Sequence, residues 1–183
     1  MSPVCLLCGG RSDADGLCEG CNASLPRLTA RHCPVCAIPD ATGERCGRCL
    51  NKPPHFDRVV APFRYEFPAT VLIQGLKYRG NLACARPLAA GLAAALEKEP
   101  YPDLIVPMPL ARARLAARGF NQAMEISRRL ATEFGLDISL DVCRRTREGA
   151  AQAALPWKQR ATNVRDAFVC DFDVTGKSVA VVD

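Results

Sequence analysis

Eight of the eleven cysteines stand in four Cys-x-x-Cys pairs within the first fifty residues. A tetrahedral zinc ion takes four soft ligands, and each Cys-x-x-Cys turn supplies two thiolates. The last two pairs repeat the first two at a constant offset of 28 residues, and nine residues separate the pairs within each half, as in a zinc ribbon. The spacing predicts two structural zinc sites, built either within each half or by cross-bracing the first pair with the third. The predicted ligands are Cys5, Cys8, Cys18, Cys21, Cys33, Cys36, Cys46 and Cys49.

The surrounding composition favours zinc over disulfides at these cysteines. The chain begins without a basic-then-apolar signal peptide, and no apolar run approaches the length of a membrane span. We therefore expect a cytoplasmic protein without membrane insertion, in which thiols stay reduced and paired cysteines are metal ligands or redox sites. A dithiol oxidoreductase would normally carry one such pair near a βαβ pattern. Two closed four-sulfur sites also leave no open position for catalysis by zinc.

A domain boundary is predicted where the cysteines stop and Pro53-Pro54 stiffens the chain, which gives domains 1–52 and 53–183. In the second domain, strands are expected at 58–65, 103–106, 138–142, 167–170 and 178–182. Helices are expected at 68–78, along the four-residue spacing of Leu88, Leu92 and Leu96, and from the cap at Asn121 to Gly135. This alternation predicts an α/β fold with a mostly parallel sheet behind a double zinc ribbon.

Two arginine-rich segments follow successive strands of this pattern. The first comes after 103–106 and carries Arg112, Arg114 and Arg118, and the second runs from Arg144 to Arg165. Between residues 112 and 165 eleven Lys/Arg stand against five Asp/Glu, in a chain whose net charge is +5. Ligands of parallel sheets bind at the carboxyl ends of strands, and guanidinium groups pair well with phosphates. We therefore expect an anionic ligand here, with a solvated basic face as the alternative.

Three motifs in this region are specific. They are Pro107-x-Pro-Leu-x-Arg-x-Arg, then Arg118-Gly-Phe-Asn-Gln-Ala, and Arg145-Thr with Gln, Leu, Arg, Asn-Val and Ala-Phe downstream. At these residues the chain resembles the ComF (competence protein F, GntX-like) family, whose amino-terminal double zinc ribbon also matches the cysteine repeat. The resemblance spans the whole chain. It implies a type I phosphoribosyltransferase-like fold, ribosyl transfer from phosphoribosyl pyrophosphate (PRPP) with Mg²⁺, and an association with DNA uptake.

The resemblance also implies residue roles. Arg145, Gln152 and Arg160 would close over the pyrophosphate of PRPP as the catalytic set. The implied substrate-binding residues are Arg118, Asn121, Gln122, Thr146, Asn163 and Asp183. Asn121 has a structural alternative as a helix cap, and the acceptor of the ribosyl group is not visible in the sequence.

The chain departs from the family pattern at its end. In this fold the strand matching 179–182 leads into two acidic residues and a Thr-x-Gly-x-Thr loop, whose backbone N–H groups cradle the 5-phosphate. Here the sequence stops at Asp183, the first acid of that pair. We therefore expect a fragment or an early-terminated product with an incomplete sheet, which binds PRPP weakly or not at all.

Two other classes of function stay open. The first is a nucleic-acid-binding module that contacts single-stranded DNA through the ribbons and basic segments, with binding that weakens as salt is added. The second is an adaptor that docks other competence proteins through the zinc domain.

The remaining cysteines, Cys84, Cys143 and Cys170, lie in apolar or strand-like contexts, and we expect them to be small core residues.

Overall fold

The computed structural model describes residues 3–28, 31–97, 99–149 and 155–183. The chain forms two compact units, one of Met1–Ile73 with Ala90–Pro100 and one of Gln74–Ala89 with Tyr101–Asp183. The predicted domain boundary at residue 52 stays a prediction. In the part of the chain that the structure describes, no helix has the length and apolar character needed to cross a bilayer.

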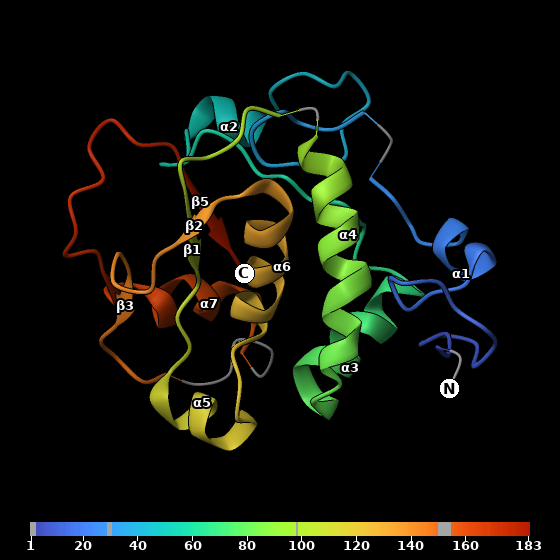
Figure 1. The fold of residues 1–183 in the computed structure, drawn as a ribbon. Helices are drawn as coiled ribbons and strands as arrows, with labels where there is room; N and C mark the ends of the chain where they lie inside the picture. The colour runs from blue at the N-terminus through green and yellow to red at the C-terminus, as the bar shows by residue number, and fades with distance from the viewer. Residues whose placement is uncertain (1–2, 29–30, 98, 150–154) are drawn as a thin grey trace. The chain divides into compact units, whose positions relative to one another are not determined.

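The first unit contains the cysteine repeat, and the repeat is structural as well as sequential. Helices α1 (Glu19–Ala23) and α2 (Gly47–Asn51) each begin directly after a cysteine, 28 residues apart (Figure 1). Isolated β-bridges join Val4 to Arg11 in the first half and His32 to Pro39 in the second, at the same offset. The two halves therefore fold in the same local way.

The prediction of a strand over 58–65 is wrong. Within the described residues this segment contributes one isolated bridge, between Arg27 and Phe63. Its backbone groups are satisfied instead by loops of the same unit: the Val59 N–H donates to the Val35 carbonyl at 2.8 Å, and the Arg64 N–H donates to that of Pro26 at 2.8 Å. Extended backbone needs partners for its polar groups but does not need a strand ladder to find them.

The second unit is built on a parallel sheet, which confirms the predicted α/β class. Strands β1 (Leu104–Pro107), β2 (Asp137–Ile138) and β5 (Val179–Val182) lie in the order β2-β1-β5. Leu104 pairs with Asp137 on one side and with Val179 on the other. Helix α6 (Gln122–Phe134) lies against all three strands (Figure 1).

The core of this unit explains why β1 was found from its sequence. Leu104 and Val106 cluster with Val142 on one side of the strand, and Ile105, which points the other way, is also buried. A strand covered on both faces is apolar without alternation. On α6 the buried residues Ala123, Ser127 and Leu130 recur at the spacing of a single helix face.

The remaining helices are α3 (Ala69–Arg79), the short 3₁₀ helix η1 (Leu82–Cys84), α4 (Ala85–Leu96), α5 (Arg112–Arg118) and α7 (Trp157–Val164). Helices α3 and α4 confirm the predictions for 68–78 and for the Leu88–Leu96 spacing. Pro87 lies in the first turn of α4, where a missing N–H costs little. The sequence did not predict α5 or α7, which lie in the two arginine-rich segments.

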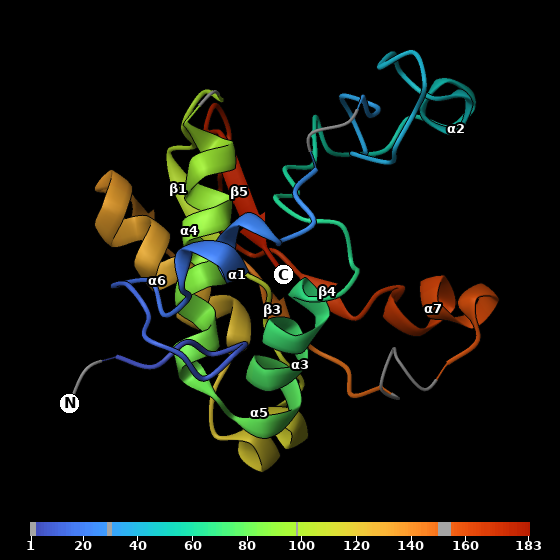
Figure 2. The same cartoon turned by 90° about the vertical axis from the view of Figure 1, so that its right-hand side faces the viewer.

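Two predicted strands differ from expectation. The strand expected at 138–142 is shortened to β2, and the one expected at 167–170 becomes β4 (Phe168–Val169), outside the parallel sheet. Strand β4 pairs antiparallel with β3 (Arg144–Arg145), and Figure 2 shows α7 to one side of this ribbon. The pairing of β3 with β4 thus brings together residues near the two ends of the second arginine-rich segment.

Candidate functional site

The eight cysteines of the repeat gather into two clusters. One contains Cys5, Cys8, Cys18 and Cys21, and the other Cys33, Cys36, Cys46 and Cys49, with the sulfurs of each cluster within 4.8 Å of one another. The Cys8 and Cys18 sulfurs are 3.7 Å apart, as are those of Cys36 and Cys46. Four sulfurs at about 2.3 Å from a tetrahedral zinc ion would be separated by roughly 3.8 Å. Both clusters fit structural zinc, in the sequential arrangement rather than the cross-braced one.

The thiols of each cluster differ in pKa, and one in each cluster has a lowered value. Burial alone would raise the pKa of Cys5, but backbone N–H groups, first that of Cys8, outweigh it and lower this pKa to about 6. The Cys46 N–H, which donates to the Cys33 sulfur at 3.3 Å, is the main cause that lowers the pKa of Cys33 to about 6.

The pKa values of two other thiols, those of Cys21 and Cys49, are raised. A hydrogen bond with Cys18 and then burial raise the pKa of Cys21 to about 12, and burial followed by its neighbouring thiols raises that of Cys49 to about 12. Four sulfurs this close cannot all carry negative charge without a compensating cation. A soft divalent ion would stabilise all four thiolates together, so the chemistry of the donor set fits zinc as well as its geometry does.

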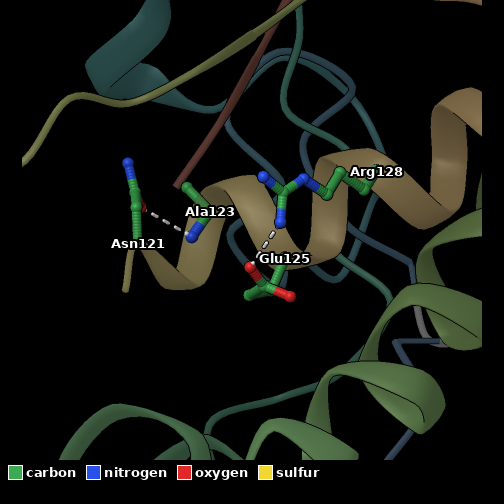
Figure 3. Close-up of polar contacts among 4 residues, drawn as sticks. All are labelled: Asn121, Ala123, Glu125 and Arg128. Carbon is green, nitrogen blue, oxygen red and sulfur yellow. Dashed lines mark hydrogen bonds and ion pairs between the residues drawn. The ribbon is translucent and has the colours of Figure 1, made fainter. Parts of the chain in front are cut away.

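A second set of polar groups lies at the carboxyl edge of the parallel sheet. The Met108 N–H, just past β1, donates to the carbonyl of Val182 at 2.8 Å, which sets the end of β1 beside the exposed Asp183. The Asn121 amide donates to the Met108 carbonyl at 3.0 Å, and its oxygen accepts from the Ala123 N–H at 3.0 Å (Figure 3). Asn121 therefore caps α6 and ties that cap to the end of β1.

The junction between α5 and α6 carries two more predicted residues. Gly119 ends α5 in the left-handed conformation, with φ 79°. The half-buried Arg118 donates to the side chain of Gln122 and lies over the Phe120 ring, with 6.0 Å from its guanidinium carbon to the ring centre. Arg118 and Gln122 are thus held to each other.

A third group surrounds Gly149, in the segment between β3 and β4. A Cβ atom placed on Gly149 would meet the Asn163 side-chain oxygen at 3.0 Å and the Arg145 Nη2 at 3.4 Å. The Arg114 guanidinium donates to the Gly149 carbonyl at 3.0 Å. The structure therefore brings Arg145 and Asn163 together and adds Arg114, from an element more than thirty residues away.

The orientation of Arg145 is fixed from two sides. Its Nε donates to the Arg147 carbonyl at 2.9 Å, and its guanidinium carbon lies 5.2 Å from the centre of the Phe168 ring. The Arg147 side chain in turn donates to the Arg165 carbonyl at 2.8 Å. A guanidinium held in this way loses little conformational entropy when it binds an anion.

Three further predicted residues belong to the same segment. The Thr146 side chain is exposed, while its N–H donates to the Ala167 carbonyl at 3.0 Å. Arg160 is half-buried and donates through Nε to the Leu155 carbonyl at 3.1 Å. Gln152 lies outside the described residues. The catalytic and substrate-binding roles of all these residues stay predictions.

Sequence reasoning did not select Arg114 or Glu148 as site residues. A carboxylate oxygen of Glu148 accepts from the Ala113 N–H at 3.4 Å, so α5 contacts the second arginine-rich segment at two points. The signal for Arg114 was present in the Pro-x-Pro-Leu-x-Arg-x-Arg motif, but only the fold shows which arginine reaches Gly149.

The chain's relatives give its family. Residues 1–50 match the double zinc ribbon domain, which confirms the predicted ribbon. Over 179 residues the chain is 33% identical to DNA utilization protein YhgH of Salmonella typhi, covering 92% of this chain and 77% of that protein. It is 28% identical over 191 residues to competence protein F of Haemophilus influenzae, covering 98% and 82%. The chain belongs to the ComF family. Within the family it is also 24% identical over 142 residues to competence protein ComFC of Bacillus subtilis, covering 66% and 59%. No solved structure matches.

Proposed function

We propose that this ComF-family protein is phosphoribosyltransferase-like and that its second arginine-rich segment binds pyrophosphate together with Mg²⁺. Transfer from whole PRPP is proposed for a form that also carries the phosphate-cradling loop expected after the last strand. The observation that carries the proposal is the group around Gly149, where Arg145, Asn163 and Arg114 converge from three elements. Guanidinium forks match phosphate oxygens in geometry and charge. The predicted roles of Arg160 and Gln152 in the same segment rest on the resemblance alone.

The chemistry expected of such a site is nucleophilic transfer at the anomeric carbon. A lone pair of the acceptor forms a bond to that carbon while its bond to the pyrophosphate oxygen breaks, and pyrophosphate leaves with the electron pair. Arg145 and Arg160 would stabilise the negative charge that develops on the leaving group, and bound Mg²⁺ would supply further charge neutralisation. At the carboxyl edge of the sheet, Asp183 would accept hydrogen bonds from the ribose hydroxyls, with Arg118, Asn121, Gln122 and Thr146 placing substrate.

A direct test uses magnesium pyrophosphate as the probe, titrated calorimetrically into the zinc-loaded protein. A charge-assisted hydrogen bond contributes about 1.5–3 kcal/mol, so Arg145→Ala should weaken binding by roughly 10–150-fold. The matched control is Arg128→Ala on α6, because Arg128 is exposed and its main contact is a 3.0 Å ion pair with Glu125 (Figure 3). An exposed pair of this kind contributes little. No binding by the wild-type protein, or equal losses in both variants, would remove the proposal.

We further propose that the protein acts in the use or uptake of DNA. The support is the naming of its relatives as DNA utilization and competence proteins. Disruption of the gene in its own host should lower the uptake of labelled DNA or growth on DNA as a nutrient, and restoration should reverse the loss. Direct contact with single strands would show as affinity that falls steeply with added salt. Unchanged DNA uptake and growth after disruption would refute this role.

The two ribbons are proposed to stabilise the first unit and to offer a docking surface for other competence proteins. Metal analysis of the purified protein should give two zinc ions per chain, because each cluster supplies one closed set of four thiolates. Cys36→Ser should lower this value to one, with the first cluster retained. A value that stays at two, or drops to zero, would contradict the independent sites.

A further inference from the structure

Two cysteines outside the zinc clusters face each other across the β3–β4 ribbon. In this ribbon Arg144 pairs with Val169 and Arg145 with Phe168. Extended by one position, the same register sets Cys143 opposite Cys170. Directly opposite residues of an antiparallel pair project to the same face of the ribbon, so the two thiols share a face.

The hydrogen-bond pattern identifies the type of pair. The Thr146 N–H donates to the Ala167 carbonyl at 3.0 Å, so this position is a hydrogen-bonded pair. Hydrogen-bonded and non-hydrogen-bonded pairs alternate along an antiparallel ladder. Cys143 and Cys170 lie one step beyond the last paired residues, at a position that the continued register makes non-hydrogen-bonded. Cα atoms at such positions approach to about 4.5 Å. Disulfides span Cα separations of about 4.4–6.8 Å, so a position of this kind can accept one.

The two thiols differ in their exposure to solvent. Cys143 is half-buried and packs against the apolar cluster of Leu104, Val106 and Val142, whereas Cys170 is exposed. The expectation that Cys170 is a core residue is therefore wrong, because β4 belongs to a two-stranded ribbon and not to the covered parallel sheet. Burial, followed by the charge and hydrogen bond of the Cys170 thiol, raises the pKa of Cys143 to about 11.

We propose that Cys143 and Cys170 form a reversible disulfide that cross-links the two ends of the second arginine-rich segment. The bond would close a loop over residues 143–170, which contains Arg145, Arg160 and Asn163. An ion pair beside it, Arg144 Nε to Asp171 Oδ2 at 2.5 Å, joins the same two ends in the reduced protein. The inference does not depend on PRPP binding, because it concerns the ribbon and not the ligand.

The oxidant is a small disulfide such as oxidised glutathione. The Cys170 thiol, which solvent reaches, loses its proton and attacks one sulfur of glutathione disulfide, releasing one glutathione thiolate and leaving a mixed disulfide. The Cys143 thiol then loses its proton and attacks the Cys170 sulfur, releasing the second glutathione thiolate. Two protein thiols lose two electrons and two protons, and one glutathione disulfide becomes two thiols. Excess reduced glutathione reverses both steps.

Peptide mapping of the full zinc-loaded chain tests the bond directly. The protein is equilibrated with defined mixtures of reduced and oxidised glutathione, quenched with acid, alkylated and digested with trypsin. Cleavage after Arg129, Arg144, Arg165 and Lys177 places Cys143 in peptide 130–144 and Cys170 in peptide 166–177, and neither peptide contains a cysteine of the zinc clusters. We expect these two peptides to become linked in mixtures that leave zinc fully bound, and to separate when reduced glutathione is added.

Hydrogen exchange tests whether the disulfide stabilises the β3–β4 ribbon. The Thr146 amide, which is bonded across the ribbon, should exchange at least about tenfold more slowly in the oxidised protein than in the reduced one, because the loop-closing bond disfavours opening of the ribbon. Cys170→Ser should abolish both the link and the slowing. The exposed position of Cys170 makes this variant tolerable to the fold, and far-ultraviolet circular dichroism checks that.

Two results would overturn the proposal. One is oxidation that yields only glutathione-capped Cys170, or links to zinc-cluster cysteines, with peptides 130–144 and 166–177 unjoined. The other is a linked protein whose Thr146 amide exchanges no more slowly than that of Cys170→Ser under the same conditions. Because the link is read in the wild-type chain, a variant that fails to fold leaves the first test intact.

Discussion

A close contact between Gly91 and Phe63 makes a sharp prediction about the first unit. A Cβ atom placed on Gly91, in α4, would stand 2.2 Å from Cζ and 2.5 Å from Cε2 of the Phe63 ring. Carbon atoms normally approach to about 3.5–4.0 Å. The ring must therefore shift by more than an ångström to admit a methyl group, and the same ring carries the contact with the Arg27 guanidinium at 5.6 Å.

The expected magnitude follows from two opposing effects. Alanine at a helix interior is favoured over glycine by about 1 kcal/mol. Overpacking of a filled site costs about 1–3 kcal/mol, and this contact lies toward the upper end because rigid ring atoms are in the way. Gly91→Ala should therefore lower the free energy of unfolding by about 1–2 kcal/mol. For a chain of this length the midpoint of thermal unfolding should fall by about 2–8 °C.

The assay is thermal and urea unfolding of the zinc-saturated protein, arranged as a double-mutant cycle. Leu at position 63 removes the ring atoms that clash, so Gly91→Ala should cost about 2 kcal/mol less in the Phe63→Leu background. Gly20→Ala in α1 is the matched control, because nothing lies within 4 Å of its Cβ position, and it should be neutral or mildly stabilising. A Gly91→Ala protein as stable as the wild type, or equal costs in both backgrounds, would refute the steric reasoning.

Three further predictions concern single contacts. Asn121→Ala removes the cap of α6 and the bond to the Met108 carbonyl, and should cost about 1–2 kcal/mol in urea unfolding. The Asp40 carboxylate accepts from the Thr42 hydroxyl at 2.5 Å and the Thr42 N–H at 2.9 Å, which lowers the pKa of Asp40 below its usual 3.8. Its stabilising contribution is present above that value and fades as pH falls through the lowered pKa, and Thr42→Ala should raise the pKa in an NMR titration. Gly9→Ala forces a side chain to φ 76° and should weaken zinc binding by about 5–30-fold in a competition titration with a chelator.

Each of these has a contrasting variant or result. Asn121→Asp keeps the oxygen that caps α6 but loses the amide donor to the Met108 carbonyl. If it lowers the free energy of unfolding as much as Asn121→Ala does, the effect belongs to the Met108 bond and not to the cap. An Asp40 pKa unmoved by Thr42→Ala would show that the backbone N–H alone sets it. For Gly9, Ala37 is the natural comparison because it occupies the equivalent position of the second half at φ 57°. A Gly9→Ala protein with unchanged zinc affinity would show that the first half tolerates the strain as the second does.

The parts predicted well from the sequence are those set by local chemistry. The ligands of each zinc cluster come from 17 consecutive residues, so cysteine spacing alone fixes which sulfurs can meet. Helix α6 was found because its cap, its apolar face and the left-handed Gly135 at its end all lie within one stretch. Strand β1 was found because burial on both faces leaves a continuous apolar run.

The parts that the sequence did not predict depend on distant partners. Helix α5 lacks a side-chain cap at Ala111, so nothing local marks where it begins. The apolar pattern at 58–65 fits a strand, but that segment finds its hydrogen bonds in loops. The contact of Arg114 with Gly149 joins residues 35 positions apart, and the exposure of Cys170 depends on which sheet its strand enters. Spacing and periodicity carry no information about these choices.

The sequential arrangement of the two cysteine clusters has a consequence for the protein under metal scarcity. In a cross-braced pair of sites, each ion would hold both halves, and loss of either would unfold the whole region. Here each cluster takes all four sulfurs from one half, so zinc loading of that half would be governed by its own affinity. As available zinc falls, the two halves should empty one after the other, and a population with one half folded should exist. Partial loss of zinc would then unfold the half with the weaker site and leave the other half folded.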